Sequence, residues 1–164
     1  MASGLSSRID RRAIKVWIIS GIIKTTVFAL IAAAIGLFVT VRLSWAGDWV
    51  WWLWVISGLL VVSYGVLVIG ILPGLNWQRW RYEVSEHQVD LQRGVWYVRR
   101  TLIPMVRVQH VDTKQGVIMR RYGLAGVTIW TAADCQEIPA LSVEAADELR
   151  DRIARLARVS DDDI

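Results

Sequence analysis

Two long stretches with almost no charged residues, separated by a short polar break, fill most of the first half of the chain. The stretch Val16–Val41 carries one charged residue, Lys24, and the stretch Val50–Leu72 carries none. At about 1.5 Å of rise per residue the second would reach about 34 Å as a helix, and a bilayer hydrocarbon core is about 30 Å thick. The pattern predicts a hairpin of two transmembrane helices, at residues 16–41 and 50–72.

Beyond Pro73 and Gly74, which we expect to end the second helix, apolar and polar residues alternate as in β-strands. The alternating runs lie at residues 79–84, 88–92, 96–104, 106–111, 127–130 and 136–138. In the third run, Trp96, Val98 and Leu102 form the apolar side. A slip of phase near residues 110–111 predicts a β-bulge. Six or seven short strands at this spacing are typical of an antiparallel barrel or sandwich.

After the last strand the period changes to that of an amphipathic helix. Ser142 is a suitable N-cap, and Ala146, Leu149, Ile153 and Leu156 follow at steps of three and four residues. We expect this helix to cap the sheet with its apolar face. The patterns therefore divide the chain into a basic N-terminus (1–15), a transmembrane hairpin (16–72), a β-rich domain (76–158) and an acidic tail (159–164), which we expect to be disordered.

The charges beside the two apolar stretches predict their orientation. Arg8, Arg11, Arg12 and Lys15 precede the first stretch, and basic residues return after the second, whereas the intervening segment 42–49 holds one arginine and one aspartate. By the positive-inside rule, we expect a multi-pass membrane protein with both termini in the cytoplasm and the short loop outside.

Tryptophan placement favours the same orientation. Eight of the ten tryptophans fall near the expected membrane interfaces, where an indole finds both apolar and polar surroundings. Those assigned to the outer side are Trp45, Trp49, Trp51, Trp52 and Trp54, and those assigned to the inner side are Trp17, Trp77 and Trp80.

Lys24 lies about 12 Å inside the first span, counted at helical rise from Val16. A lysine at a helix centre costs about 2.5–3.5 kcal/mol to insert. Counting the same depth back from Leu72 reaches Tyr64 in the antiparallel helix, so we predict a contact between Lys24 and Tyr64. The alternative is that Lys24 extends its stem toward the headgroups, and the sequence leaves both open.

Small residues recur four apart in the first span, at Gly21, Thr25, Ala29 and Ala33, and seven apart in the second, at 58 and 65. Small residues allow transmembrane helices to approach closely. They serve either packing within the hairpin or oligomerisation, and the sequence does not separate these uses.

The sequence shows no catalytic or metal-binding pattern. Cys135 is the only cysteine, and His87 and His110 have no cysteine or carboxylate partner at ligand spacing. Phosphate-binding glycine loops and nucleophile elbows are also missing. We therefore expect a protein that is not an enzyme and needs no cofactor.

Basic residues of the second half are the candidate contacts. They are Arg79, Arg81, Arg99, Arg100, Arg107, Lys114, Arg120 and Arg121. Near an anionic leaflet each contributes about 1 kcal/mol, so they fit a lipid-facing surface, although solubility alone would also explain them. Because they are not interleaved with a stacking platform of aromatic residues, nucleic acid is not expected as a partner.

Two motifs resemble a known family. The run Pro104–Val111 reads P-x-x-R-V-Q-x-V, and the run Tyr122–Ala132 reads Y-G-L-A-x-V-x-I-x-T-A. With the segment Ile138–Leu141 and the membrane hairpin, they make the chain similar to the bacterial membrane-flanked PH domain family of YdbS-like proteins over essentially its whole length.

The resemblance implies a PH-like barrel or sandwich capped by the C-terminal helix, no catalysis, and assembly with a larger membrane protein that contains repeated domains of this kind. Arg107 and Gln109 are the candidate partner contacts within the first motif. Phosphoinositide recognition is not carried over, because Glu83, Glu86 and Asp90 occupy the region that basic residues fill in relatives that bind it. The alternative function is binding of anionic lipid headgroups, or movement of lipid or small amphiphiles.

Overall fold

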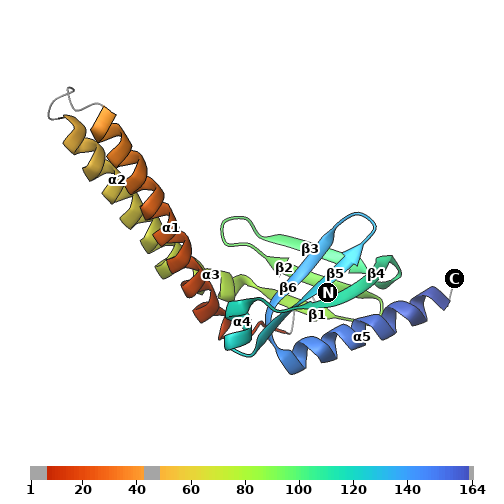
Figure 1. Cartoon of the computed structure of the whole chain (residues 1–164). Coiled ribbons are helices and arrows are strands. Elements are labelled where there is room, and N and C mark those ends of the chain that lie inside the picture. The colour runs from red at the N-terminus through yellow and green to blue at the C-terminus, as the bar shows by residue number, and fades with distance from the viewer. Residues whose placement is uncertain (1–6, 43–48, 163–164) are drawn as a thin grey trace. The chain divides into compact units, whose positions relative to one another are not determined.

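The computed structural model describes residues 7–42 and 49–162. The chain forms two compact units (Figure 1), one built from Trp17–Gly74 and the other from the residues up to Val16 together with those from Leu75 onward. The sequence predicted a β-rich domain in one continuous piece. The second unit is instead assembled from both sides of the first.

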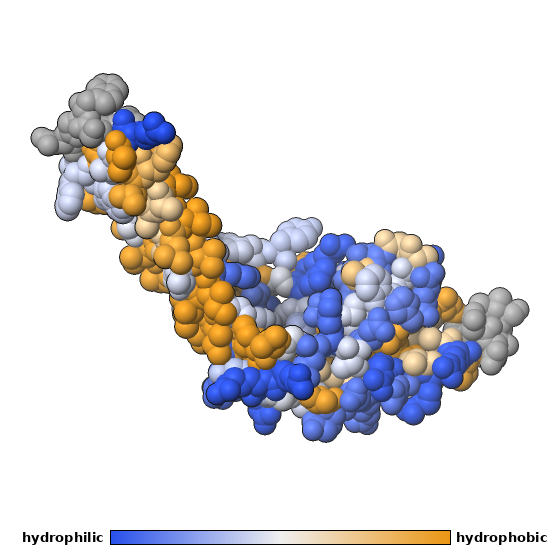
Figure 2. Space-filling view, viewed as in Figure 1, coloured by the Kyte–Doolittle hydropathy of each residue, from blue (hydrophilic) through white to orange (hydrophobic). Residues whose placement is uncertain are grey.

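The first unit consists of helices that are apolar over nearly their whole surface. Helix α1 spans Ala13–Arg42, and α2 (Trp49–Gly65) continues through a π-helical stretch η1 (Val66–Ile71) into α3 (Leu72–Arg79). Ala13–Arg42 and Trp49–Arg79 are long and apolar enough to cross a membrane. Figure 2 shows the hydrophobic surface that runs along them. The expected loop at residues 43–48, including Trp45, lies outside the described residues.

The expected helix end at Pro73 and Gly74 is wrong, because the helix continues to Arg79. Proline has no N–H to donate to the carbonyl four residues back, and its ring crowds that carbonyl. The π-helical stretch lies directly before Pro73, and the N–H of Leu72 bonds the carbonyl of Leu67, five residues back. A π-turn is one of the local adjustments that let an apolar helix accommodate proline.

Glycines set the register between α1 and the second helix. A methyl group built on Gly21 would lie 3.1 Å from the Val68 carbonyl oxygen, and one on Gly65 would lie 3.2 Å from Thr25. One on Gly58 would meet nothing within 4 Å. Gly21 and Gly65 therefore pack the hairpin, which is one of the two uses that the sequence left open, whereas Gly58 faces away from the neighbouring helix.

The second unit is a sandwich of two three-stranded antiparallel sheets, in the orders β1-β2-β3 and β4-β5-β6. The strands are β1 (Arg81–Val84), β2 (Gln88–Arg93), β3 (Arg99–Pro104), β4 (Val108–Lys114), β5 (Leu124–Thr131) and β6 (Cys135–Ser142); η2 (Met105–Arg107) and α4 (Val117–Arg121) are short helices between strands, and α5 (Val143–Asp162) closes the chain. Two apolar helices, an antiparallel β-unit and a C-terminal helix confirm the predicted fold class. The expected bulge is also present, between Val108 and His110.

The core lies between the sheets and beneath α5. Val89, Leu91 and Ile103 fill it from the first sheet, and β5 is buried from Leu124 to Ile129 because α5 covers its outer side. The prediction for residues 96–104 has the wrong phase. Ile103 is buried there, whereas Leu102 is 53% exposed and Trp96 88% exposed.

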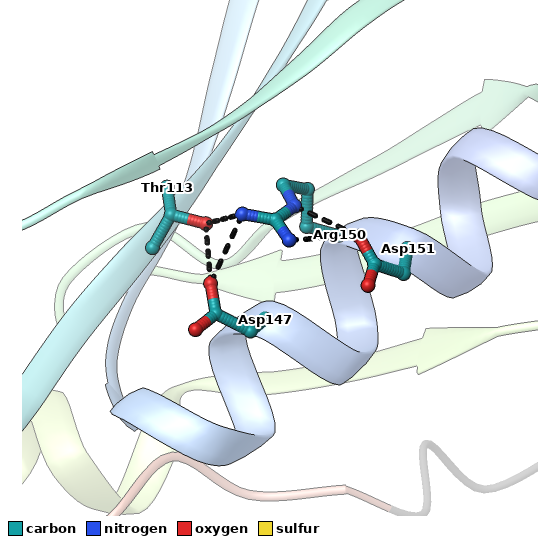
Figure 3. Close-up of polar contacts among 4 residues, drawn as sticks. All are labelled: Thr113, Asp147, Arg150 and Asp151. Atoms are coloured by element: carbon teal, nitrogen blue, oxygen red, sulfur yellow. Dashed lines mark hydrogen bonds and ion pairs between the residues drawn. The ribbon is translucent and has the colours of Figure 1, made fainter.

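Helix α5 begins as predicted, since the Ala145 N–H donates to the Ser142 hydroxyl at 3.2 Å. Figure 3 shows the polar cluster that joins it to β4: Arg150 donates to Asp147 at 3.1 Å and to Asp151 at 2.8 Å, and Asp147 lies 3.3 Å from the Thr113 hydroxyl. The hydrogen bond to Asp151 raises the pKa of Arg150 above its ordinary value. The helix extends to Asp162, into the tail that we expected to be disordered.

A segment before α1 closes one side of the sandwich. In the N-terminal segment, Ser7–Arg12, Ser7 exchanges backbone hydrogen bonds of 3.1 and 3.2 Å with Tyr82 of β1, and the Asp10 N–H donates at 3.0 Å to Ala140 of β6. Ile9, between them, is 3% exposed. The segment thus bridges the outer edges of both sheets and covers part of an otherwise open strand edge.

Burial beside this segment raises the pKa of Tyr82, and hydrogen bonding to Ser7 partly opposes the rise. Trp77 donates its indole N–H to the Ile9 carbonyl at 3.1 Å, and Trp80 is 8% exposed. Two of the three tryptophans expected at the inner membrane interface, Trp77 and Trp80, therefore belong to the β-unit.

Candidate functional site: the groove between β3 and β4

The side of the sandwich opposite the N-terminal segment contains a groove of about 490 Å³. We call it the β3–β4 groove. It is lined by Arg99, Thr101, Leu102, Ile103, Pro104, Val106, Arg107, Val108, Gln109, Thr131, Ala132, Ala133, Asp134 and Gln136. The groove lies where two edge strands from different sheets face each other across η2.

Both sequence motifs converge on this groove. Pro104, Arg107 and Gln109 come from the first motif, and Thr131 and Ala132 come from the end of the second. The antiparallel pairing of β4 with β5 brings these segments together, with Val108 opposite Thr131. Some of the residues that carry the family resemblance therefore lie on the surface of this groove, and not all of them belong to the core.

The backbone at the groove can accept another strand. Within the described part of the chain, β3 pairs only with β2, and β4 pairs only with β5. Each strand therefore has one edge whose N–H and C=O groups make no ladder. Edges of this kind bind extended peptides by strand addition, and neighbouring hollows select the side chains.

The walls of the groove combine apolar and charged side chains. Leu102 and Val106 are 53% and 49% exposed. Arg99 and Arg107 lie among them. The Asp134 carboxylate accepts the Cys135 N–H at 2.8 Å and the Gln136 amide at 2.6 Å, so it holds the turn between β5 and β6. An apolar hollow with two arginines suits a segment with hydrophobic and acidic side chains.

Three of the predicted contact residues, Arg99, Arg107 and Gln109, gather in this groove. The others are spread over the unit. Arg79 ends α3, Arg81 begins β1, and Arg120 and Arg121 end α4. None of these four arginines lines the β3–β4 groove.

Arg100 has a structural partner. Its guanidinium binds both carboxylate oxygens of Asp90, with Nε at 2.9 Å from each, and Asp90 is 4% exposed. This hydrogen bond, and then the Asp90 charge, raise the pKa of Arg100 above its ordinary value. Arg100 neutralises a buried carboxylate, so we do not keep it among the partner contacts.

Within the helical unit, Lys24 is exposed and Tyr64 packs against Phe28, with ring centroids 5.2 Å apart. Thr25 lies opposite Gly65, and Gly21 opposite Val68. This register sets Lys24 level with Val66, about two residues or 3 Å from the predicted depth. Among the described residues no hydrogen bond joins Lys24 to Tyr64, and their contact stays a prediction.

The described residues contain no group of three or more metal-ligating side chains. Cys135 is exposed. His110 stacks on Trp130, with ring centroids 5.4 Å apart, and Trp130 donates to Asp112 at 3.0 Å. This surface cluster holds β4 to β5.

Sequence reasoning missed the apolar part of the groove. It assigned Leu102 to the apolar side of its strand, and it did not consider Val106 or Thr131–Asp134 as part of a site. The signal that could have found them was the pair of motifs, because both contain residues of the groove.

Comparisons with known proteins agree with this architecture. A family model described as "Bacterial PH domain" matches residues 13–157. The chain is 43% identical over 158 residues to UPF0699 transmembrane protein YdbS of Bacillus subtilis (strain 168), with 96% of each chain covered. It is 24% identical over 98 residues to UPF0699 transmembrane protein YdbT of the same organism, covering 56% of this chain and 20% of that relative. No solved structure gives a significant match.

Proposed function

The chain belongs to the bacterial PH domain family and is a membrane protein, and on this basis we propose that it is a non-enzymatic assembly protein of the bacterial inner membrane. Its PH-like domain, residues 76–158 completed by the N-terminal segment, binds a partner protein. The β3–β4 groove supports this proposal most directly, since it combines exposed Leu102 and Val106 with two strand edges that have no partner strand among the described residues.

The proposed partner is a larger related membrane protein with repeated PH-like domains. The similarity to YdbT supports it, because the matched segment is only 20% of that relative and leaves room for further domains. YdbS and YdbT come from the same organism. Related domains with complementary edges can pair strand to strand, and self-association of this chain would use the same edges.

Photo-cross-linking tests the groove. A photoreactive amino acid in place of Val106, in the full chain in native membranes, is expected to give an adduct with a second membrane protein. The matched control is Val117, on α4, which is 89% exposed and lies outside the groove. Mass spectrometry of the adduct identifies the partner. Equal adducts at both positions, or none at Val106, would contradict the proposal.

We also propose that both ends of the chain lie in the cytoplasm. The basic residues before the first helix support this orientation. The hydrogen bonds of Ser7 with Tyr82 and of Asp10 with Ala140 support it further, because they join residues before the hairpin to residues after it. Such bonds require the two helices to return the chain to the side from which it started.

The single cysteine tests this orientation. Cys135 is exposed on the β-unit. In intact spheroplasts a membrane-impermeant maleimide is expected to leave it unlabelled, and in lysed ones to label it fully. A Cys135→Ser variant gives the background. Labelling of intact spheroplasts would place the domain outside and refute the orientation.

A further inference from the structure

The loop that joins β2 to β3 carries the most exposed aromatic residues of the β-unit. In this aromatic loop, Gly94–Val98, Trp96 is 88% exposed, Tyr97 83% and Val98 46%. It lies at the end of the β2–β3 hairpin (Figure 1). The tip of a hairpin has too few neighbouring residues to bury the rings of Trp96 and Tyr97. Adjacent exposed aromatic rings of this kind mark a contact with a partner outside the domain.

The loop holds its aromatic residues in a defined shape. Gly94 has a φ of 113°, and a methyl group built on it would lie 1.9 Å from the Tyr97 carbonyl oxygen. Only glycine fits this backbone and this close approach. The turn therefore fixes Trp96 and Tyr97 at the tip.

The charges at the base of the loop indicate an anionic partner. Arg93 and Arg99 are paired directly across the strands, and like charges opposite each other destabilise a sheet. No ion pair to either residue occurs within the described part of the chain. An anion between the two guanidinium groups would convert their repulsion into attraction.

The wider segment is consistent with a phosphate-rich surface. Leu91–Val111 contains four arginines and no acidic residue. Arg100 is engaged by Asp90, and Arg93, Arg99 and Arg107 remain for other partners. Protein surfaces that contact lipid headgroups commonly carry tryptophan and tyrosine beside arginine. The aromatic rings enter the interface, and the guanidinium groups bind phosphates.

We propose that the aromatic loop docks on the bilayer that holds α1 and α2, with Trp96 and Tyr97 in the headgroup region and Arg93 and Arg99 on lipid phosphates. The domain is joined to its helices at Val16–Trp17 and at Gly74–Leu75. For about 100 residues the radius of gyration is about 13 Å, so a domain tethered at two points stays close to the bilayer. The effective lipid concentration is then high, and one loop is enough to dock.

Depth-dependent quenching tests the docking with purified full-length protein in vesicles that contain anionic phospholipid, at low protein density. A Tyr97→Cys variant in a Cys135→Ser background carries an environment-sensitive fluorophore. The matched control carries it at Glu148→Cys, an exposed acidic position of α5. A shallow spin-labelled phospholipid is expected to quench the Tyr97 probe severalfold more than the Glu148 probe.

Equal quenching at the two positions would overturn the docking and leave a protein as the partner of the loop. The charge-reversed variant R93E, which leaves the groove residue Arg99 in place, is expected to lose most of the quenching when the probe is at Tyr97. Unchanged quenching would refute the role of the arginine pair. These outcomes are independent of the Val106 cross-link, so docking on lipid and assembly through the β3–β4 groove can each fail alone.

Discussion

Replacing Ile9 by alanine is expected to lower the free energy of unfolding of the β-sandwich by about 2–5 kcal/mol, the usual cost of truncating a buried isoleucine. Ile9 is 3% exposed, between the backbone bonds that tie Ser7 to β1 and Asp10 to β6. The total free energy of unfolding of a domain of this size is about 5–15 kcal/mol. A residue before the first membrane helix thus carries a large part of the stability of a domain that follows the second.

Amide hydrogen exchange of the full chain in detergent measures this effect. Peptides that cover β1 and β6 should exchange much faster in Ile9→Ala than in the wild type. Arg11→Ala is the matched control, because Arg11 lies in the same segment and is exposed. If the β1 and β6 peptides of Ile9→Ala exchanged at the wild-type rate, the segment would not hold the two sheets together.

Replacing Gly21 by leucine is expected to separate the two membrane helices. A side chain at Gly21 meets the Val68 carbonyl oxygen at 3.1 Å and its Cγ1 at 3.2 Å, and backbone cannot move aside as a flexible side chain can. At Gly58 nothing lies within 4 Å. Gly58→Leu adds the same apolar volume and should leave the hairpin intact.

Disulfide formation reports the separation. Cysteines at positions 25 and 65, in a Cys135→Ser background, replace two residues that touch across the hairpin, and oxidation should join them. Adding Gly21→Leu should reduce the yield severalfold, while adding Gly58→Leu should not. Similar yields in all three proteins would mean that Gly21 does not control the distance between the helices.

The main architecture could be predicted from the sequence because it depends on long patterns. The two apolar stretches and the stripe of Ala146, Leu149 and Ile153 each extend over several turns, so single exceptions do not hide them. Alternation in short strands carries less information. At residues 96–104 it suggested that Trp96 and Leu102 were buried, whereas the buried residue is Ile103.

Other features depend on contacts between distant residues. Pro73 continues a helix because a π-helical stretch precedes it, and no local pattern indicates such a stretch. The only local sign that the N-terminal segment packs on the sandwich is the spacing of its apolar residues. Ile9, Ala13 and Val16 recur at steps of four and three residues, and all three are buried. The groove could not be foreseen as a shape, since it depends on which strand edges stay unpaired, although the two motifs indicated its residues.

The helical hairpin lies between two parts of the sandwich in the sequence, and this determines the order of folding steps during synthesis. The ribosome releases the N-terminal segment before either apolar helix, and its hydrogen-bond partners at Tyr82 and Ala140 emerge only after both helices. Since domains fold as units during synthesis, the sandwich can close only after both helices have been made. Closure of the sandwich therefore requires that the hairpin bring the two parts of the domain back together.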